Sequence, residues 1–139
     1  MMNVKVHVVT GGKFTGFYGS AGSAGIDLYA RDVLWDCEHG VWLVPLGVRM
    51  EIPEGYYGDL RARSGIYRRG AWLANGCGVV DSDYRGEIVA VFYGERPCEP
   101  GERCAQIIFQ KCEPVSIEMV VNLNDTVRGR DGFGSTGVH

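Results

Sequence analysis

Short stretches in which apolar and polar residues alternate recur along most of the chain. The clearest are VKVHVV at 4–9 and CAQIIFQ at 104–110. Alternation with a period of two over four to eight residues is the pattern of a β-strand with one buried face. The pattern predicts strands at 4–9, 26–30, 41–52 (in two pieces around Pro45), 55–62, 72–80, 87–93, 104–110 and 115–121.

Turn-forming residues separate these stretches. Asn75-Gly76 inside 72–80 predicts a two-residue hairpin turn. Glu99-Pro100-Gly101-Glu102 predicts a turn between two strands. The polar, Arg-rich stretch 63–70 predicts one helical turn at most. Many short strands joined by turns predict an all-β fold, a sandwich or a barrel.

The ends of the chain differ from this pattern. Glycines break residues 11–22 into a long loop, and the sequence from Thr126 onward has no core-forming period. We therefore expect one domain with a β-sheet core over 1–126 and a flexible arm over 127–139.

Composition narrows the class of protein. The chain has 139 residues and a net charge of −3, which fits one domain and does not favour duplex nucleic-acid binding. No apolar run approaches the ~18 residues of a membrane span, and the first residues lack the apolar segment of a signal peptide. The five cysteines form no C-x-x-C pair, so we expect reduced thiols in a cytoplasmic protein.

Two clusters in the first two thirds of the chain carry candidate chemistry. Arg63-Ser64-Gly65 combines a guanidinium, a hydroxyl and a permissive backbone, which suits an oxyanion. In the loop that follows Val80, Asp81 and Asp83 flank a polar turn next to Tyr84, and a carboxylate near a phosphate can activate water. A plain turn and a polar loop with Asx turns are the alternative interpretations.

Two further clusters lie toward the C-terminus. Gln106 and Gln110 share one strand face in an otherwise apolar run, so either the core or a ligand must satisfy their amides. In the tail, Phe133 between glycines is placed to stack on a planar ligand, next to residues of phosphate-binding type. Together the four clusters have the parts that a nucleotide phosphohydrolase needs.

The order of these motifs resembles the homotrimeric dUTP pyrophosphatases (dUTPases). The five matching stretches are AGIDLYA (24–30), RARSGI (61–66), NGCGVVDSDYRGEI (75–88), PGERCAQIIF (100–109) and RGRDGFGSTG (128–137). The resemblance implies a distorted jelly-roll or barrel-like β fold, a homotrimer, and active sites at subunit interfaces over which the arm closes. The implied reaction is hydrolysis of dUTP to dUMP and pyrophosphate, with Mg²⁺ carried by the triphosphate and no metal ligand on the protein itself.

The resemblance also implies roles for individual residues. Asp81 matches the general base, Tyr84 the ring under the deoxyribose, and Asn75, with neighbouring backbone groups such as those of Val80, the reader of the uracil edge. Asp27 matches a support of the phosphate site. The phosphate contacts are Arg63, Ser64, Gly65 and Gln106 from the core, with Arg128, Ser135 and Thr136 from the arm, where Phe133 stacks on uracil beside Gly134.

One departure and two alternatives accompany this interpretation. Asp131 stands where the family usually has glycine; Asp can adopt a left-handed backbone there at some cost, and it adds a negative charge near the triphosphate, which Arg130 can offset. The alternatives are a dCTP deaminase-like enzyme of the same fold and a nucleotide-gated regulatory binding protein. For the latter, the loop 10–23 and the stretch 35–42 are candidate partner surfaces.

Overall fold

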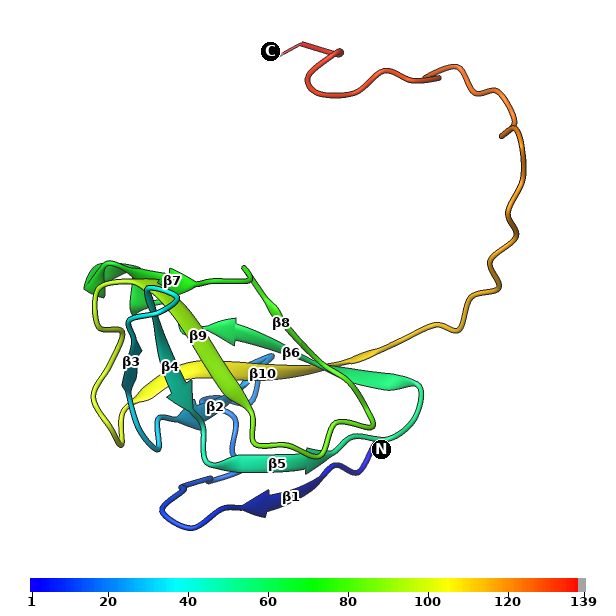
Figure 1. Cartoon of the computed structure of the whole chain (residues 1–139). Coiled ribbons are helices and arrows are strands. Elements are labelled where there is room, and N and C mark those ends of the chain that lie inside the picture. Colours follow the sequence, from blue (N-terminus) through cyan, green and yellow to red (C-terminus); the bar gives the residue numbers. More distant parts are fainter. Residues whose placement is uncertain (138–139) are drawn as a thin grey trace.

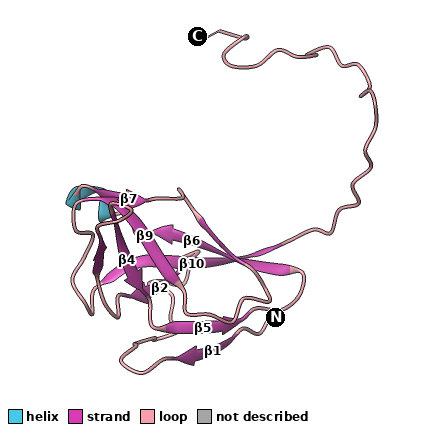
Figure 2. Cartoon of the chain, in the orientation of Figure 1, coloured by secondary structure: helices cyan, strands magenta, loops and turns pink. Residues whose placement is uncertain are grey.

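The computed structural model describes residues 1–137, and over these residues the regular secondary structure consists almost entirely of strands (Figure 1). Figure 2 shows helical structure at one end of the sheets, and η1 is the one helical element of the described residues. This confirms the expected all-β class. No helix in the described part is long and apolar enough to cross a membrane. The elements are β1 (Lys5–Val8), β2 (Ile26–Tyr29), β3 (Leu34–Asp36), β4 (Val41–Pro45), β5 (Val48–Glu51), β6 (Tyr56–Ala62), η1 (Ile66–Arg69), β7 (Ala71–Leu73), β8 (Gly78–Val80), β9 (Val89–Gly94) and β10 (Arg103–Lys111).

The strands form two four-stranded antiparallel sheets and a two-stranded ribbon. One sheet has the order β2-β10-β6-β8, the second has β3-β4-β9-β7, and β1 pairs with β5. Apart from the local pair β3 and β4, neighbouring strands come from distant parts of the sequence, so most of the pairing is long-range. Strands distributed in this way between two sheets make a sandwich of jelly-roll type.

The core lies on the inner faces of these sheets, where the alternation of each strand puts its apolar residues. In the first sheet Leu60 of β6 faces Ile107 of β10, and both are buried. In the second sheet Phe92 of β9 is fully buried beside Leu73. Burial of such side chains contributes about 1.5–3 kcal/mol each.

A polar cluster on the other face of the first sheet explains one of the two glutamines. Asp59 is buried, and its carboxylate accepts hydrogen bonds from Arg61 Nε at 2.8 Å and from Gln110 Nε2 at 2.8 Å. Gln110 is therefore satisfied within the protein, by a buried carboxylate rather than by a ligand.

The N-terminal loop is fastened to the core by contact between two glycines. A Cβ on Gly12 would lie 2.4 Å from the carbonyl oxygen of Gly47, and a Cβ on Gly47 would lie 2.7 Å from Gly12 Cα. Gly47 also has a φ of +72°, which favours glycine. The two backbones approach this closely because neither residue has a side chain.

The Asn75-Gly76 turn forms, but the predicted hairpin is wrong. Gly76 has a φ of +68°, and its N–H donates to the Leu73 carbonyl at 3.1 Å. However, β7 before the turn pairs with β9 and β8 after it pairs with β6. The turn is a corner between the two sheets, since pairing with distant strands competes successfully with local pairing.

The predicted strand at 115–121 is also wrong for this chain alone. The stretch has no strand structure, and its alternating apolar side chains are exposed. Figure 1 shows the chain leaving β10 and extending away from the sheets toward its C-terminus. A strand needs a partner for its backbone groups, and none of the described residues supplies one. The sequence predictions also missed one element, the short strand β3. The helical turn expected within 63–70 is present as η1.

Candidate active site

Four of the predicted site residues line one hollow of about 240 Å³. Asn75, Val80, Asp81 and Tyr84 surround it, with Leu60 and Val91 forming its apolar wall. Asn75 comes from the corner between β7 and β8, whereas Asp81 and Tyr84 follow the end of β8. The hollow therefore combines an amide, a carboxylate and a ring around an apolar floor, which suits a small planar ligand with polar edges.

The loop after β8 is shaped by its own hydrogen bonds. The Tyr84 N–H donates to the carbonyl of Asp81 at 3.2 Å, and the Tyr84 hydroxyl donates to the carbonyl of Glu87 at 2.9 Å. Arg85 Nη1 donates to the Ser82 carbonyl at 2.7 Å. These contacts leave the Asp81 side chain exposed at the mouth of the hollow, where a water molecule can reach it.

A second hollow, of about 270 Å³, gathers other predicted residues. Asp27, Arg63, Ser64 and Gln106 line it together with Ser23. The Asp27 carboxylate lies 3.1 Å from Arg63 Nε and 3.1 Å from Arg103 Nη1. One carboxylate thus orients two guanidinium groups, whose remaining N–H donors can point toward an anion.

The second glutamine faces this hollow. Gln106 Nε2 donates to the Ala62 carbonyl at 3.3 Å, at the end of β6. A Cβ on Gly25 would lie 2.5 Å from Gln106 Oε1, so glycine at that position makes room for the amide. Gln106 is therefore held next to the strand end that leads into Arg63.

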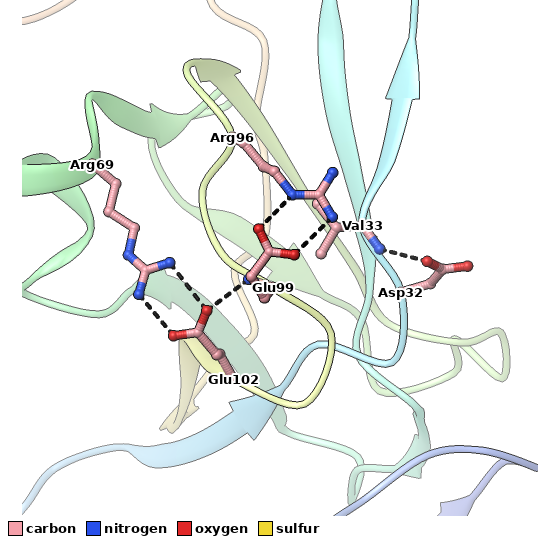
Figure 3. Close-up of polar contacts among 6 residues, drawn as sticks. All are labelled: Asp32, Val33, Arg69, Arg96, Glu99 and Glu102. Atoms are coloured by element: carbon pink, nitrogen blue, oxygen red, sulfur yellow. Dashed lines mark hydrogen bonds and ion pairs between the residues drawn. The ribbon is translucent and has the colours of Figure 1, made fainter.

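Bidentate ion pairs brace the turn before β10 (Figure 3). Arg69 donates to both carboxylate oxygens of Glu102, at 3.1 and 2.7 Å, and Arg96 donates to both of Glu99, at 2.9 and 3.1 Å. The guanidinium of Arg69 lowers the pKa of Glu102. Gly65 and Arg63 line a third hollow of about 360 Å³ beside this turn.

The predicted arm residues do not contribute to any of these hollows. Phe133 is fully exposed, and Arg128 Nε donates to the carbonyl of Asp131 within the arm itself, at 2.8 Å. Phe133 has a φ of +50°, and it is the only non-glycine residue with a positive φ in the described part of the chain. Asp131 itself does not adopt the left-handed backbone that its position allows; among the non-glycine residues it falls on Phe133, two positions later.

Asp81 and Arg63 lie near opposite ends of β6. Val80 is paired with Gly58 near the start of β6, and Asp81 follows Val80. Arg63 follows Ala62, the last residue of the same strand. At about 3.3 Å per residue, the five-residue offset between Gly58 and Arg63 separates the two groups by roughly 17 Å along the strand. One chain therefore does not bring Asp81 and Arg63 onto the same phosphate.

Several residues around these hollows were not singled out from the sequence. Ser23 directly precedes the first motif, at the end of a glycine-rich loop that gave no signal beyond flexibility, and Gly25 lies inside that motif. Arg103 lies inside the fourth motif, and its pairing with Asp27 depends on a contact across 76 residues that no local pattern reveals.

Comparisons with known proteins agree on one family. The dUTPase family model matches residues 17–137. A deoxyuridine 5′-triphosphate nucleotidohydrolase of Orientia tsutsugamushi (strain Boryong) is 41% identical over 87% of this chain and 86% of its own length. The probable enzyme of the same name from Schizosaccharomyces pombe is 39% identical over 86% of this chain and 88% of its own.

Solved structures show the same fold. A Staphylococcus bacteriophage 80alpha dUTPase with dUPNHPP superposes with a TM-score of 0.82 over 98% of this chain and 99% of that one, at 21% identity. A mutant dUTPase from phage phi11 of S. aureus, described with a structural Mg(II) ion, gives 0.72 over 86% of this chain and 97% of that one, at 15% identity. The family model and the sequence relatives together span nearly all of the chain, which therefore belongs to the dUTPase family.

Proposed function

We propose that this chain hydrolyses dUTP to dUMP and pyrophosphate. The observation that carries the proposal is the hollow that gathers Asn75, Asp81 and Tyr84, because it offers a pyrimidine-sized slot with an exposed carboxylate at its mouth. The curated relatives are named as deoxyuridine 5′-triphosphate nucleotidohydrolases, which supports the same substrate.

Within this hollow, each side chain has a proposed task. Asn75 and the adjacent backbone read the edge of uracil, and the narrow apolar wall excludes the methyl group of thymine. Tyr84 lies against the sugar, where a 2′-hydroxyl would collide with its ring. Asp81 accepts a proton from the attacking water, which is directed in line at the α-phosphorus.

The second hollow supplies the proposed phosphate contacts. Arg63, Ser64 and Gln106 line it, and Asp27 holds Arg63 in place. Among the described residues, the one group of three potential metal ligands is Asp36, Glu38 and His39, in the turn between β3 and β4 and away from both hollows. Mg²⁺ would therefore arrive with the nucleotide, held by phosphate oxygens and water, and neutralise charge on the triphosphate.

We also propose that the active form is a homotrimer with shared sites. Asp81 and Arg63 lie too far apart along β6 to act on one phosphate, so Asp81 of one copy would work with Arg63 of another. The exposed apolar side chains of 115–123 support association, because alternating residues of this kind need cover that the described chain does not give them. The arm, with Arg128, Phe133, Gly134, Ser135 and Thr136, would then close over a site on a neighbouring copy.

Product analysis tests the proposed reaction. The protein is incubated with Mg²⁺ and dUTP, dTTP, UTP or dCTP, and pyrophosphate and ammonia are both measured. We expect pyrophosphate from dUTP and much less from the other three. Ammonia from dCTP without pyrophosphate would indicate a deaminase instead, and nucleotide binding without any product would indicate a regulatory binding protein.

Mixing two inactive variants tests the shared sites. Asp81→Asn and Arg63→Ala are each expected to abolish most turnover, and they are unfolded together and refolded as mixed oligomers. If the two residues act in one site from different copies, some mixed sites contain neither substitution, and part of the activity returns. Activity that stays at the level of the separate variants would argue against sites shared in this way.

A further inference from the structure

The side chain of Glu87, at the end of the loop that carries Tyr84, accepts three hydrogen bonds from two residues. Arg31 Nε and Nη2 donate to its two carboxylate oxygens at 2.8 and 2.9 Å, and the Gly47 N–H donates to one of them at 2.9 Å. The side chains of Arg31 and Glu87 are only 32% and 21% exposed. This bidentate, partly buried arrangement is more rigid than an ion pair in open solvent.

The backbone of Glu87 is equally well fixed. Ile88, the next residue, is buried; its N–H donates to the Val48 carbonyl at 2.9 Å, and its own carbonyl accepts from Leu46 at 2.9 Å. The Glu87 carbonyl therefore has a defined position, and this is the group that accepts the Tyr84 hydroxyl at 2.9 Å.

Gly86 makes that contact sterically possible. A Cβ at Gly86 would lie 2.3 Å from Tyr84 Oη and 2.6 Å from Cζ. The ring is folded back over its own loop into space that any other residue would occupy. The ring's position in the hollow thus depends on the Glu87 carbonyl. That carbonyl is held by the backbone contacts of Ile88 together with the contacts of the Glu87 side chain to Arg31 and Gly47.

We propose that Glu87, held by Arg31, is a positioning residue that sets discrimination between deoxyribose and ribose. It acts through Tyr84: the fixed carbonyl keeps the ring close enough to the sugar to exclude a 2′-hydroxyl. This proposal rests on the proposed function, since it assumes that the hollow holds a deoxynucleotide. Without Glu87 the ring can withdraw, which admits UTP while leaving the other contacts to dUTP in place.

The test compares kcat/KM for dUTP and UTP in Glu87→Ala and Tyr84→Phe, singly and combined. Loss of one hydrogen bond predicts that each single variant lowers the dUTP-to-UTP ratio about three- to tenfold. Because Glu87 is proposed to act only through the contact that Tyr84→Phe removes, the double variant is expected to lower the ratio no further than the more affected single variant. A role confined to general stability would lower the amount of active enzyme without changing this ratio.

Glu99→Ala is the matched control. Glu99 accepts the same bidentate pair of hydrogen bonds, from Arg96, and neither residue lines the hollow. We expect its ratio to equal that of the unmodified protein. If Glu87→Ala does not fold, Arg31→Lys is used instead. It keeps the positive charge but loses the bidentate contact with Glu87, and we expect it to lower the dUTP-to-UTP ratio in the same way.

Three results separate the possible failures. An unchanged dUTP-to-UTP ratio in Glu87→Ala would overturn the positioning role; if Arg31→Lys is used in place of Glu87→Ala, an unchanged ratio in that variant would do the same. Additive effects in the double variant would also overturn it. Failure of the unmodified protein to hydrolyse dUTP would instead overturn the proposed function on which this inference rests.

Discussion

Strand β10 and the segment that follows it have the same kind of sequence and opposite surroundings. In β10, Ile107 is fully buried between two partner strands, β2 and β6. In residues 115–123, Ile117 also occupies every-second-residue spacing, yet its side chain is 81% exposed. Alternation therefore reports that one face of a segment will be covered, and it does not say which chain provides the cover.

The comparison extends to the site. The sheet core holds its hollows already formed, with side chains fixed by ion pairs and backbone contacts. The described part of the arm makes its hydrogen bonds within residues 126–137, such as the one between Arg128 and Asp131. The core is therefore preformed, whereas the described arm is not packed against it.

The largest expected effect is the loss of turnover when the proposed catalytic base is removed from the core. Asp81→Asn removes the proposed base and leaves the fold, so turnover of dUTP should fall by about 10²–10⁴-fold while nucleotide binding remains. Steady-state kinetics and calorimetric titration with a non-hydrolysable dUTP analogue measure the two properties separately. Turnover near that of the unmodified protein would reject Asp81 as the base.

A pair of identical substitutions tests the two regions directly. Ile107→Ala leaves a cavity in the core and should lower the free energy of unfolding by about 2–5 kcal/mol at every protein concentration. Ile117→Ala removes an exposed side chain and should matter only where chains associate, so its effect on the melting temperature should depend on concentration. Equal, concentration-independent losses from both would mean that the two regions do not differ as described.

Removing the arm tests whether the core can work alone. Deletion of residues 128–139 should lower turnover by roughly 100-fold, because the substrate loses closure over the site. The melting temperature should change little, since the described part of this segment adds almost nothing to the core. The last two residues of the deleted segment lie outside the described structure. Normal turnover in the shortened protein would identify the arm as a passive tail.

The smallest expected effect is on how the free energy of unfolding changes at acidic pH. The Arg31 guanidinium holds the pKa of Glu87 below its ordinary value of 4.5. Such a carboxylate stabilises the fold fully above its ordinary pKa, and the contribution is lost as the pH falls through the lower folded pKa. Urea unfolding should therefore show a cost for Glu87→Gln at about pH 6 that shrinks toward about pH 3. A cost independent of pH over this range would contradict the sign of the shift.

The sequence predicted most strands because alternation is a local property of each segment. It could not predict which strands pair with one another. Asn75-Gly76 has the composition of a hairpin turn, yet the two strands that flank it belong to different sheets. The same limit applies to the site. The motif residues could be named in advance, but the separation of roughly 17 Å along β6 between the positions of Asp81 and Arg63 follows from strand register. Likewise, the contact of Arg31 with Glu87 spans 56 residues.

The contact between Gly12 and Gly47 limits how this protein can be redesigned. Each glycine fills the volume that a side chain on the other would need, so exchanging either one for alanine, or both together, pushes the N-terminal loop off the turn between β4 and β5. That turn also supplies the amide that holds Glu87. Replacing these glycines to stiffen the loop would therefore disturb the hollow that Asn75, Asp81 and Tyr84 line, through the backbone and without changing a residue that lines it.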